Sequence, residues 1–319
     1  MSAPDVVVLG EVLVELSSRE PLIDGATLRL GFSGDALNAA AAAAAAGAHA
    51  ALVTRVPDDE LGDQLVQRVA ELGVDTSSII RASGQHGVYL SHADPFGARQ
   101  FTYVREGSAA SRLAMTDLDE RCLESAGVVL SSGVACAVSD TMSAAVVRAA
   151  EVARRFVYDP NFRPRLTTPS AAAGMLQRLA PLADVVTPSW PDEARHLLGL
   201  AADASLDEAL SAFAALGPGA VVLTCGPDGA VVAADGSVTA VPGVPAPVVV
   251  DQTGAGDCLA GTLAARLALG DPLLDAVALA TAAAALSVGG QGGTGRVPTF
   301  TETRSALAAA RPVEELRPQ

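Results

Sequence analysis

Short runs of consecutive apolar residues recur along the chain, and segments with helical periodicity lie between them. Such runs are typical of strands in a parallel sheet that is buried on both faces. The expected strands are Val6–Gly10, Ala51–Thr54, Val128–Ser131, Phe156–Asp159, Val185–Thr187 and Val221–Thr224. The expected helices include Leu61–Leu72, Thr141–Arg154, Ser170–Leu179 and Leu206–Leu216. Strands that alternate with helices predict an α/β fold with a parallel sheet covered on both faces.

Two stretches, Val12–Phe32 and Gly87–Arg105, break this rhythm because their apolar and polar residues alternate. The second stretch contains Asp94-Pro95-Phe96-Gly97, which is typical of a hairpin turn. We expect about four antiparallel strands that form a small sheet outside the main one. Neither stretch is long enough to fold alone, so the pattern predicts one domain over residues 1–319 with a lid inserted at about 12–32 and 87–105.

The amino-acid composition predicts a core that is built from small side chains. Half of the 319 residues are hydrophobic, yet aromatic residues make up only 3%. The 36 acidic and 21 basic residues give a formal charge of −15. An acidic surface repels phosphate backbones, which argues against nucleic acid and anionic membranes as partners. An anionic substrate would therefore need a local basic pocket.

The cysteines and the start of the chain bear on the compartment. Cys122, Cys136, Cys225 and Cys258 form no CxxC pair, and a chain of this length is expected to keep them reduced. The first residues, Met1–Asp5, contain no basic region of the kind that begins a signal peptide. We therefore expect a cytoplasmic protein.

An alanine run, Ala39–Ala46, imitates a membrane segment. Alanine is a poor membrane anchor but the best helix former. We interpret the run as a helix packed tightly against a sheet, with a membrane span as the disfavoured alternative.

The run Asp251-Gln252-Thr253-Gly254-Ala255-Gly256-Asp257 is the strongest chemical signal. It lies between a β-like run, Pro247–Val250, and an expected helix, Cys258–Leu269. Glycines allow a tight turn that directs backbone N–H groups at one point, and the N-terminus of a helix attracts anions. The run predicts a phosphoryl site with Asp257 as the base. The alternative is a simple glycine turn in which the aspartate only caps the helix.

This run resembles the C-terminal motif of the ribokinase-like (PfkB) carbohydrate kinases. Phe32–Asn38, followed by the alanine-rich helix, looks like the first motif of that family, in which a glycine and an asparagine hold sugar hydroxyl groups. Thr224–Gly229 looks like the nucleotide loop of the family, although Pro-Asp-Gly also makes an ordinary β-turn.

The resemblance implies a doubly wound, mostly parallel α/β core with a small β-sheet lid, ATP as donor and Mg²⁺ as charge partner. It assigns the chemistry to Asp257 with Gly254, Ala255 and Gly256. The residues that it assigns to the sugar, apart from those discussed next, are Gly34, Asp35, Asn38, Tyr89 and Asp251. The residues that it assigns to the nucleotide are Asn161, Ser189, Thr224, Gly226 and Gly229. The lid would leave one apolar face exposed, which predicts a homodimer formed lid to lid.

Two further stretches, Tyr103–Ser111 and Asp159–Arg163, are similar to 2-keto-3-deoxygluconate kinases. In those enzymes a tyrosine and two arginines, here Tyr103, Arg105 and Arg163, meet the carboxylate end of the substrate. A guanidinium can hold a carboxylate with two parallel hydrogen bonds. Each arginine could instead form a surface ion pair. The alternatives are a fructokinase or related hexose kinase, or a non-catalytic sugar-binding sensor on the same fold.

Some positions depart from the family pattern. An Asn-x-x-Glu motif often organises Mg²⁺ through water, and here the corresponding stretch is Thr187–Glu193. The acid is either Asp192 or Glu193, depending on the alignment. The stretch after Arg163 lacks a tryptophan that is often present in the keto-deoxygluconate kinases, and the four histidines suggest no metal cluster.

Overall fold

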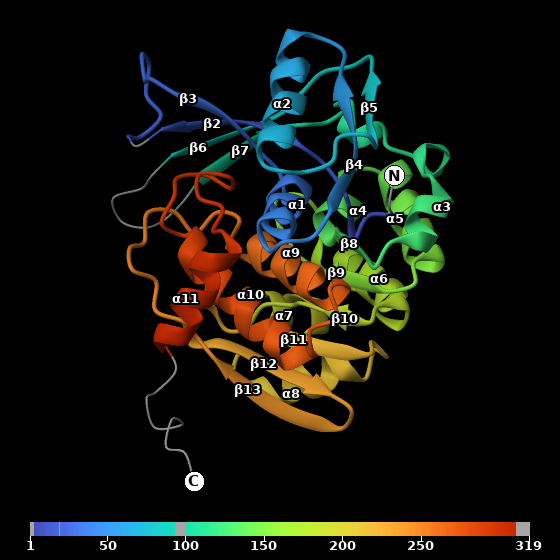
Figure 1. Cartoon of the computed structure of the whole chain (residues 1–319), viewed down its shortest axis with the longest axis vertical. Coiled ribbons are helices and arrows are strands. Elements are labelled where there is room, and N and C mark those ends of the chain that lie inside the picture. Colours follow the sequence, from blue (N-terminus) through green and yellow to red (C-terminus); the bar gives the residue numbers. More distant parts are fainter. Residues whose placement is uncertain (1–2, 19, 93–99, 311–319) are drawn as a thin grey trace.

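A nine-stranded sheet forms the centre of the protein (Figure 1). The computed structural model describes residues 3–18, 20–92 and 100–310. The strand order is β13-β12-β11-β10-β9-β8-β1-β4-β5, and the pairings of β12 with β11 and with β13 are antiparallel whereas the others are parallel. The strands are β1 (Val6–Leu9), β4 (Ala50–Pro57), β5 (Ile79–Ala82), β8 (Val128–Ser132), β9 (Phe156–Asp159), β10 (Val185–Val186), β11 (Ala220–Thr224), β12 (Gly229–Ala234) and β13 (Ser237–Pro242). The six strands expected from the apolar runs are therefore confirmed.

Helices cover both faces of this sheet, which confirms the expected doubly wound α/β core. One face packs against α1 (Asp35–Ala45), α2 (Glu60–Glu71), α9 (Ala255–Ala268) and α10 (Leu273–Ser287). The other face packs against α3 (Glu120–Ser125), α4 (Gly133–Val138), α5 (Asp140–Val152), α6 (Pro169–Leu179), α7 (Asp192–Leu198) and α8 (Leu206–Ala214). The last helix, α11 (Phe300–Ala310), contacts α10. Short 3₁₀ turns lie at Ala110–Arg112, Met115–Asp117, Ala180–Leu182 and Gly226–Asp228.

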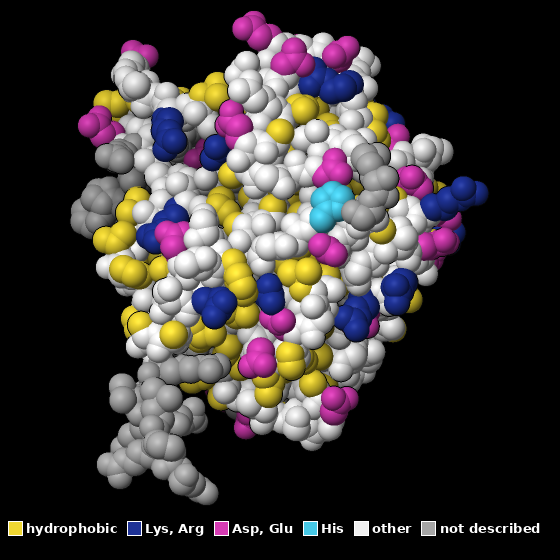
Figure 2. All heavy atoms as spheres, viewed as in Figure 1, with side chains coloured by type: hydrophobic (Ala, Val, Ile, Leu, Met, Phe, Trp, Pro, Cys, Tyr) yellow, Lys and Arg dark blue, Asp and Glu magenta, His cyan; other side chains and the backbone are white. Residues whose placement is uncertain are grey.

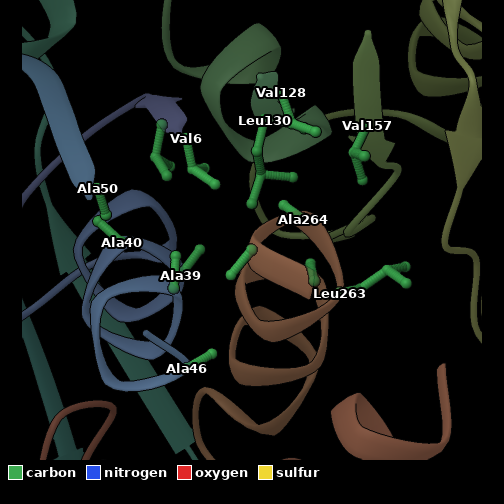
Figure 3. Close-up of a cluster of buried hydrophobic side chains, with 14 of the residues drawn as sticks. Val6, Ala39, Ala40, Ala46, Ala50, Val128, Leu130, Val157, Leu263 and Ala264 are labelled. Atoms are coloured by element: carbon green, nitrogen blue, oxygen red, sulfur yellow. The ribbon is translucent and has the colours of Figure 1, made fainter. Parts of the chain in front are cut away.

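The alanine run forms most of α1, and its small side chains let α1 and α9 approach closely. Figure 3 shows Ala39 and Ala40 of α1 and Ala264 of α9 in one buried cluster beneath the strands. A Cβ added at Gly261 of α9 would lie 2.0 Å from the carbonyl oxygen of Ala39, so the two backbones are in contact. Within the described part of the chain, no helix is long and apolar enough to cross a membrane.

A second sheet of four strands lies beside the α/β core, in the order β3-β2-β6-β7 (Figure 1). Its strands are β2 (Leu13–Ser18), β3 (Arg29–Ser33), β6 (Gly87–His92) and β7 (Gln100–Val104). The expectation of a purely antiparallel sheet is wrong, because β2 and β6 pair in parallel. Each of these strands follows a parallel strand of the main sheet, so both leave the core in the same direction. The expected turn at residues 94–97 lies outside the described residues.

The segment before the glycine-rich motif also differs from the expectation. Residues 247–250 form no strand; the side chains of Val248, Val249 and Val250 are exposed. Pro245 and Pro247 have no backbone N–H to donate, which disfavours a strand, and the N–H of Val250 donates to the carbonyl of Val288 at 2.8 Å. Helix α9 begins at Ala255, three residues before the expected start, so the last three residues of the motif lie in its first turn.

The surface carries its charges in a mixed pattern. On the face in Figure 2, basic side chains are interspersed with acidic ones rather than gathered into one patch.

Candidate active site

A cavity of about 320 Å³ lies between the small sheet and the carboxyl ends of the central strands. Many of the residues selected from the sequence line it together. They are Gly34, Asp35, Asn38, Tyr89, Tyr103, Arg105, Asn161, Arg163, Gly254, Ala255, Gly256 and Asp257. Residues that come from both ends of the chain and from the small sheet therefore meet at one site.

Asp257 is held by two asparagines from different elements. Its Oδ2 accepts a hydrogen bond from Nδ2 of Asn38 at 2.8 Å, and its Oδ1 accepts one from Nδ2 of Asn161 at 2.9 Å. Asn38 lies in α1, and Ser33 Oγ donates to its Oδ1 at 3.0 Å. Asn161 follows β9 with a φ of 42°, a left-handed conformation that asparagine tolerates better than most residues. The orientation of the carboxylate is thus fixed by both amides.

The same aspartate is almost fully buried, with 9% of its surface exposed. Burial raises the pKa of Asp257, while the hydrogen bond from Asn38, the nearby Arg163 charge and the hydrogen bond from Asn161 oppose that rise. Asp257 is the third residue of α9 rather than its N-cap, because Gly254 occupies the cap position. A buried carboxylate that faces a cavity and has a raised pKa is suited to general-base chemistry.

The first turn of α9 forms the rim beside Asp257. Gly254 has a φ of 80°, and a Cβ there would meet Asn38 Nδ2 and the backbone of Gly293, each at 3.1 Å. A Cβ at Gly256 would meet nothing within 4 Å. The N–H of Ala255 donates to the carbonyl of Gln252 at 3.2 Å, so this N–H is used within the loop. The N-terminus of this 14-residue helix carries partial positive charge, and Gly256 at its second position leaves free space beside the backbone. This arrangement suits the binding of an anionic group.

The structure places Asp251 outside the cavity lining. Its Oδ1 accepts hydrogen bonds from the backbone N–H and the hydroxyl of Thr253, at 2.9 and 2.7 Å. Its Oδ2 accepts a hydrogen bond from the N–H of Gly292 at 2.9 Å. Asp251 therefore joins the motif loop to the glycine-rich segment 289–295, and its assignment to the sugar stays a prediction.

Arg105 is buried and forms an ion pair with Glu11, which the sequence analysis missed. Nη1 of Arg105 donates to Oε1 of Glu11, and the guanidinium also lies 4.3 Å from the ring centre of Tyr103. Burial raises the pKa of Glu11 to about 7, although the charge of Arg105 opposes this rise. Glu11 comes directly after Gly10 at the carboxyl end of β1, and this position could have identified it.

Asp35 and Arg163 complete the charged lining. Oδ2 of Asp35 accepts a hydrogen bond from Ser132 Oγ at 2.5 Å. Burial is the main cause that raises the pKa of Asp35 to about 6, and the negative charge of Asp257 adds to this rise. Nη1 of Arg163 donates to the carbonyl of Phe162 at 3.1 Å. Other lining residues that the sequence analysis did not select are Leu13, Ser33, Val134, Gln252 and Thr253.

Tyr89 lines the cavity from the small sheet and is anchored by a second unpredicted acid. Its hydroxyl donates to Oε2 of Glu15 at 2.5 Å, and that oxygen also accepts a hydrogen bond from the N–H of Gly293 at 3.3 Å. Burial raises the pKa of both Tyr89 and Glu15. The phenol is therefore protonated and its ring is held at the cavity wall.

The residues that the sequence assigns to the nucleotide lie at the ends of β10 and β11. Ser189 and Thr224 form an isolated parallel bridge, and Thr224 N–H donates to Pro188 O at 2.9 Å. Gly226 and Gly229 both have positive φ, and a Cβ at Gly229 would lie 2.2 Å from the carbonyl of Val241. None of these residues lines the cavity around Asp257, whereas Asn161, assigned to the same group, is bonded to Asp257.

Asp192 and Glu193, the two alternative acids of the sequence analysis, differ in burial and in hydrogen bonding. The side chain of Asp192 is 87% exposed. Glu193 is buried; its Oε1 accepts a hydrogen bond from Phe162 N–H at 2.5 Å, and its Oε2 accepts one from Ser189 N–H at 2.6 Å. Glu193 thus joins the loops that follow β9 and β10, and it does not line the cavity around Asp257.

The described residues contain no group of three or more His, Cys, Asp or Glu side chains arranged to hold a metal ion. Asn161 Oδ1 is buried without a hydrogen-bond partner, and the nearby carboxyls of Asp159 and Glu193 are buried. Mg²⁺ usually takes one or two carboxylates and completes its shell with water and substrate phosphates. The residues present therefore fit a Mg²⁺ ion that arrives with a nucleotide.

Residues 3–299 match the family model described as pfkB family carbohydrate kinase. The chain belongs to this family. It is an ATP-dependent carbohydrate kinase, and the fold and the family resemblance expected from the sequence are both confirmed.

One relative of this pfkB kinase is the 2-dehydro-3-deoxygluconokinase of Thermoproteus tenax, which is 34% identical over 95% of this chain and 94% of its own length. The crystal structure of a PfkB protein from Polaromonas sp. JS666 is 27% identical, with a TM-score of 0.83 over 95% of this chain and all of that one. A structure from E. coli in complex with ATP and Mg²⁺ is 24% identical, with a TM-score of 0.85 over 97% of this chain and 100% of its own, and shows the shared fold.

Proposed function

We propose that this kinase transfers the γ-phosphoryl group of ATP to the primary hydroxyl of 2-keto-3-deoxygluconate and forms the 6-phosphate. One observation carries the proposal: the guanidinium groups of Arg105 and Arg163 line the same cavity as Asp257, beside the ring of Tyr103. In a protein with a formal charge of −15, two guanidinium groups at one cavity suit a carboxylate. The T. tenax relative is named a kinase of 2-dehydro-3-deoxygluconate, which is another name for 2-keto-3-deoxygluconate, and this name supports the proposed substrate.

In this proposal Asp257 is the general base. It accepts the proton of the acceptor hydroxyl while the oxygen–phosphorus bond forms and the bond from the γ-phosphorus to the bridging oxygen of ADP breaks. Asn38 and Asn161 keep the two carboxylate oxygens in position. The first turn of α9 faces the phosphoryl group, and Gly256 lets that group approach the backbone.

The nucleotide would lie along the loops after β10 and β11, near Ser189, Thr224, Gly226 and Gly229. Mg²⁺ would supply positive charge to the phosphates, with Glu193 and Asp159 as the nearby acids. The whole chain would act as one kinase domain in which the segments 12–32 and 87–105 close over the sugar.

A coupled assay of ADP release tests the substrate. The panel contains 2-keto-3-deoxygluconate, fructose, ribose and gluconate. We expect kcat/KM to be largest for the keto acid, and we expect Arg105→Ala and Arg163→Ala each to lower it roughly ten- to hundred-fold, as expected for a lost charged hydrogen bond. Equal use of fructose would favour a hexose kinase, and no sugar-dependent ADP release would favour a sugar-binding sensor.

We also propose a homodimer formed through the outer face of the small sheet. Val14, Leu16, Leu30, Phe32, Val88, Leu90 and Val104 share this face, with Thr102 as a polar residue among them, and Leu30 and Val104 are 51% and 61% exposed. Exposed apolar faces of this kind are usually covered by a partner.

We also propose that the kinase is cytoplasmic, because ATP is supplied there and the four cysteines are free thiols.

A further inference from the structure

Glu11 and Arg105 leave hydrogen-bonding capacity unused inside the protein. Oε2 of Glu11 and Nε of Arg105 are both buried without a hydrogen-bond partner, although the two side chains are ion-paired through Oε1 and Nη1. Both side chains line the cavity that contains Asp257. An unsatisfied buried donor next to an unsatisfied buried acceptor is costly, so this pair is arranged to meet a further group.

The charges around the cavity show what a carboxylate substrate would meet. The ionisable lining consists of three carboxyl groups, Glu11, Asp35 and Asp257, and two guanidinium groups, Arg105 and Arg163, together with the phenols of Tyr89 and Tyr103. With every carboxyl group ionised, the acids outnumber the guanidinium groups. A fully ionised cavity would therefore repel an anion that the two arginines alone would attract.

Glu11 is the carboxylate with which such a substrate competes directly, because both need the guanidinium of Arg105. The groups that face Glu11 are Arg105 after β7, Asp35 at the start of α1 and Tyr103 of β7. Burial and the negative charge of Asp35 favour the neutral form of Glu11, and Arg105 is the group that opposes them. When the guanidinium of Arg105 pairs with another carboxylate instead, it lowers the pKa of Glu11 less, and the neutral form of Glu11 becomes more favourable.

We infer that an anionic sugar substrate enters this cavity together with a proton from solvent, which Glu11 takes up as Arg105 pairs with the substrate. The inference rests on the proposed carboxylate substrate. In the empty cavity, ionised Glu11 holds the guanidinium; in the complex, neutral Glu11 remains beside it and the substrate carboxylate carries the balancing charge. The proton returns to solvent when the product leaves. Glu11 is thus a positioning residue that couples substrate affinity to pH.

Proton uptake can be measured directly by titration calorimetry without ATP, so that no turnover occurs. 2-Keto-3-deoxygluconate is titrated into the wild-type protein in two buffers that differ in ionisation enthalpy. Because the pKa of Glu11 in the empty cavity is raised to about 7, we expect uptake of about one proton at about pH 8 and little uptake below about pH 6. The Kd should weaken by close to tenfold for each pH unit above about pH 8.

Two isosteric variants identify the group that takes up the proton. Glu11→Gln should abolish the uptake and make the Kd independent of pH. Asp35→Asn, the matched change at the other nearby carboxyl, should weaken binding because Asp35 is assigned to the sugar, but the number of protons taken up per bound sugar should stay close to that of wild type. Thermal melting verifies that both variants are folded. If Asp35→Asn loses the uptake and Glu11→Gln keeps it, the assignment to Glu11 is wrong.

The wild-type measurement is decisive even where a variant does not fold. Binding of the keto acid with no proton uptake at any pH overturns the inference and leaves the proposed substrate intact. Failure of the keto acid to bind overturns the proposed substrate, and the inference with it.

Discussion

Asn38 and Asp257 are separated by 219 positions in the sequence, yet Nδ2 of the asparagine lies 2.8 Å from Oδ2 of the aspartate. The bond joins α1 to the first turn of α9, two helices whose backbones are in contact at Gly261 and Ala39. The position of the candidate base is therefore set by the packing of two helices as well as by the motif loop.

Asp257→Asn should lower kcat by ~10²–10⁴, because the amide cannot accept the proton of the acceptor hydroxyl. Asn38 and Asn161 each donate to one carboxylate oxygen of Asp257. An amide keeps only one accepting oxygen, so one of these two hydrogen bonds is lost and the melting temperature should fall slightly. Steady-state kinetics and sugar binding by calorimetry measure the two effects. A variant with kcat near that of wild type would remove Asp257 from the role of base.

Gly256→Val should abolish activity while the protein stays folded, because a branched side chain would fill the space in which the phosphoryl group meets the backbone. The matched control is Gly174→Val in α6, since a Cβ at either glycine meets nothing within 4 Å. Circular dichroism and ADP release should separate the two variants. Full activity in a folded Gly256→Val protein would show that phosphate does not approach this turn.

Gly261→Ala should destabilise the protein by roughly 1–3 kcal/mol or more, because its Cβ would lie 2.0 Å from the carbonyl oxygen of Ala39. Separation of α1 from α9 should also lower kcat through the bond between Asn38 and Asp257. Gly174→Ala is the control, and it should stabilise α6 by about 0.5–1 kcal/mol. Denaturant melts report both changes; equal stability of the two variants would refute the close helix contact.

The pH profile of kcat should show an acid limb from Asp257. The base acts only when ionised, so activity is lost as pH falls through its pKa. Burial raises that pKa, and the limb should therefore lie above the value of about 3.9 for an ordinary aspartate. Arg163 lowers the pKa of Asp257, so Arg163→Ala should move the limb to higher pH. Arg148→Ala, which removes an exposed ion pair with Glu120, should leave the limb in place.

Val104→Glu should convert the proposed dimer into a monomer, because a charge would be placed on the apolar outer face of the small sheet. Val238→Glu is a close control, since Val238 also lies on an edge strand and is 62% exposed, compared with 61% for Val104. Light scattering at micromolar concentration gives the mass of each variant. A monomeric wild-type protein would remove the dimer from the proposal.

Much of the main sheet could be predicted because buried parallel strands are continuous apolar runs, a signal that lies within each strand. The pairing of β2 with β6 could not be read in this way, since alternation shows that a strand has two different faces but does not reveal its neighbour. The valines at 248–250 look like a strand by composition alone. The prolines before them, Pro245 and Pro247, carry the information against that interpretation.

At the site, motif residues were predictable because glycine, asparagine and aspartate are local requirements of the turn. Glu11 was missed because its importance depends on Arg105, which follows β7 in a different sheet. The choice between Asp192 and Glu193 depended on the phase of α7, and adjacent helix positions differ in direction by about 100°. A single residue of uncertainty at the start of the helix therefore left both acids open.

The contact between Gly261 and Ala39 has a consequence for how new acceptor specificities could be obtained in the laboratory. It leaves no room for added atoms between α1 and α9, so libraries directed at these helices would mostly yield proteins with a displaced Asn38 or Asp257. Tyr89, Tyr103 and Arg105 reach the same cavity from strands of the second sheet or its edge, outside that contact. Randomising those strands can therefore reshape the acceptor pocket while the phosphoryl-transfer geometry stays intact.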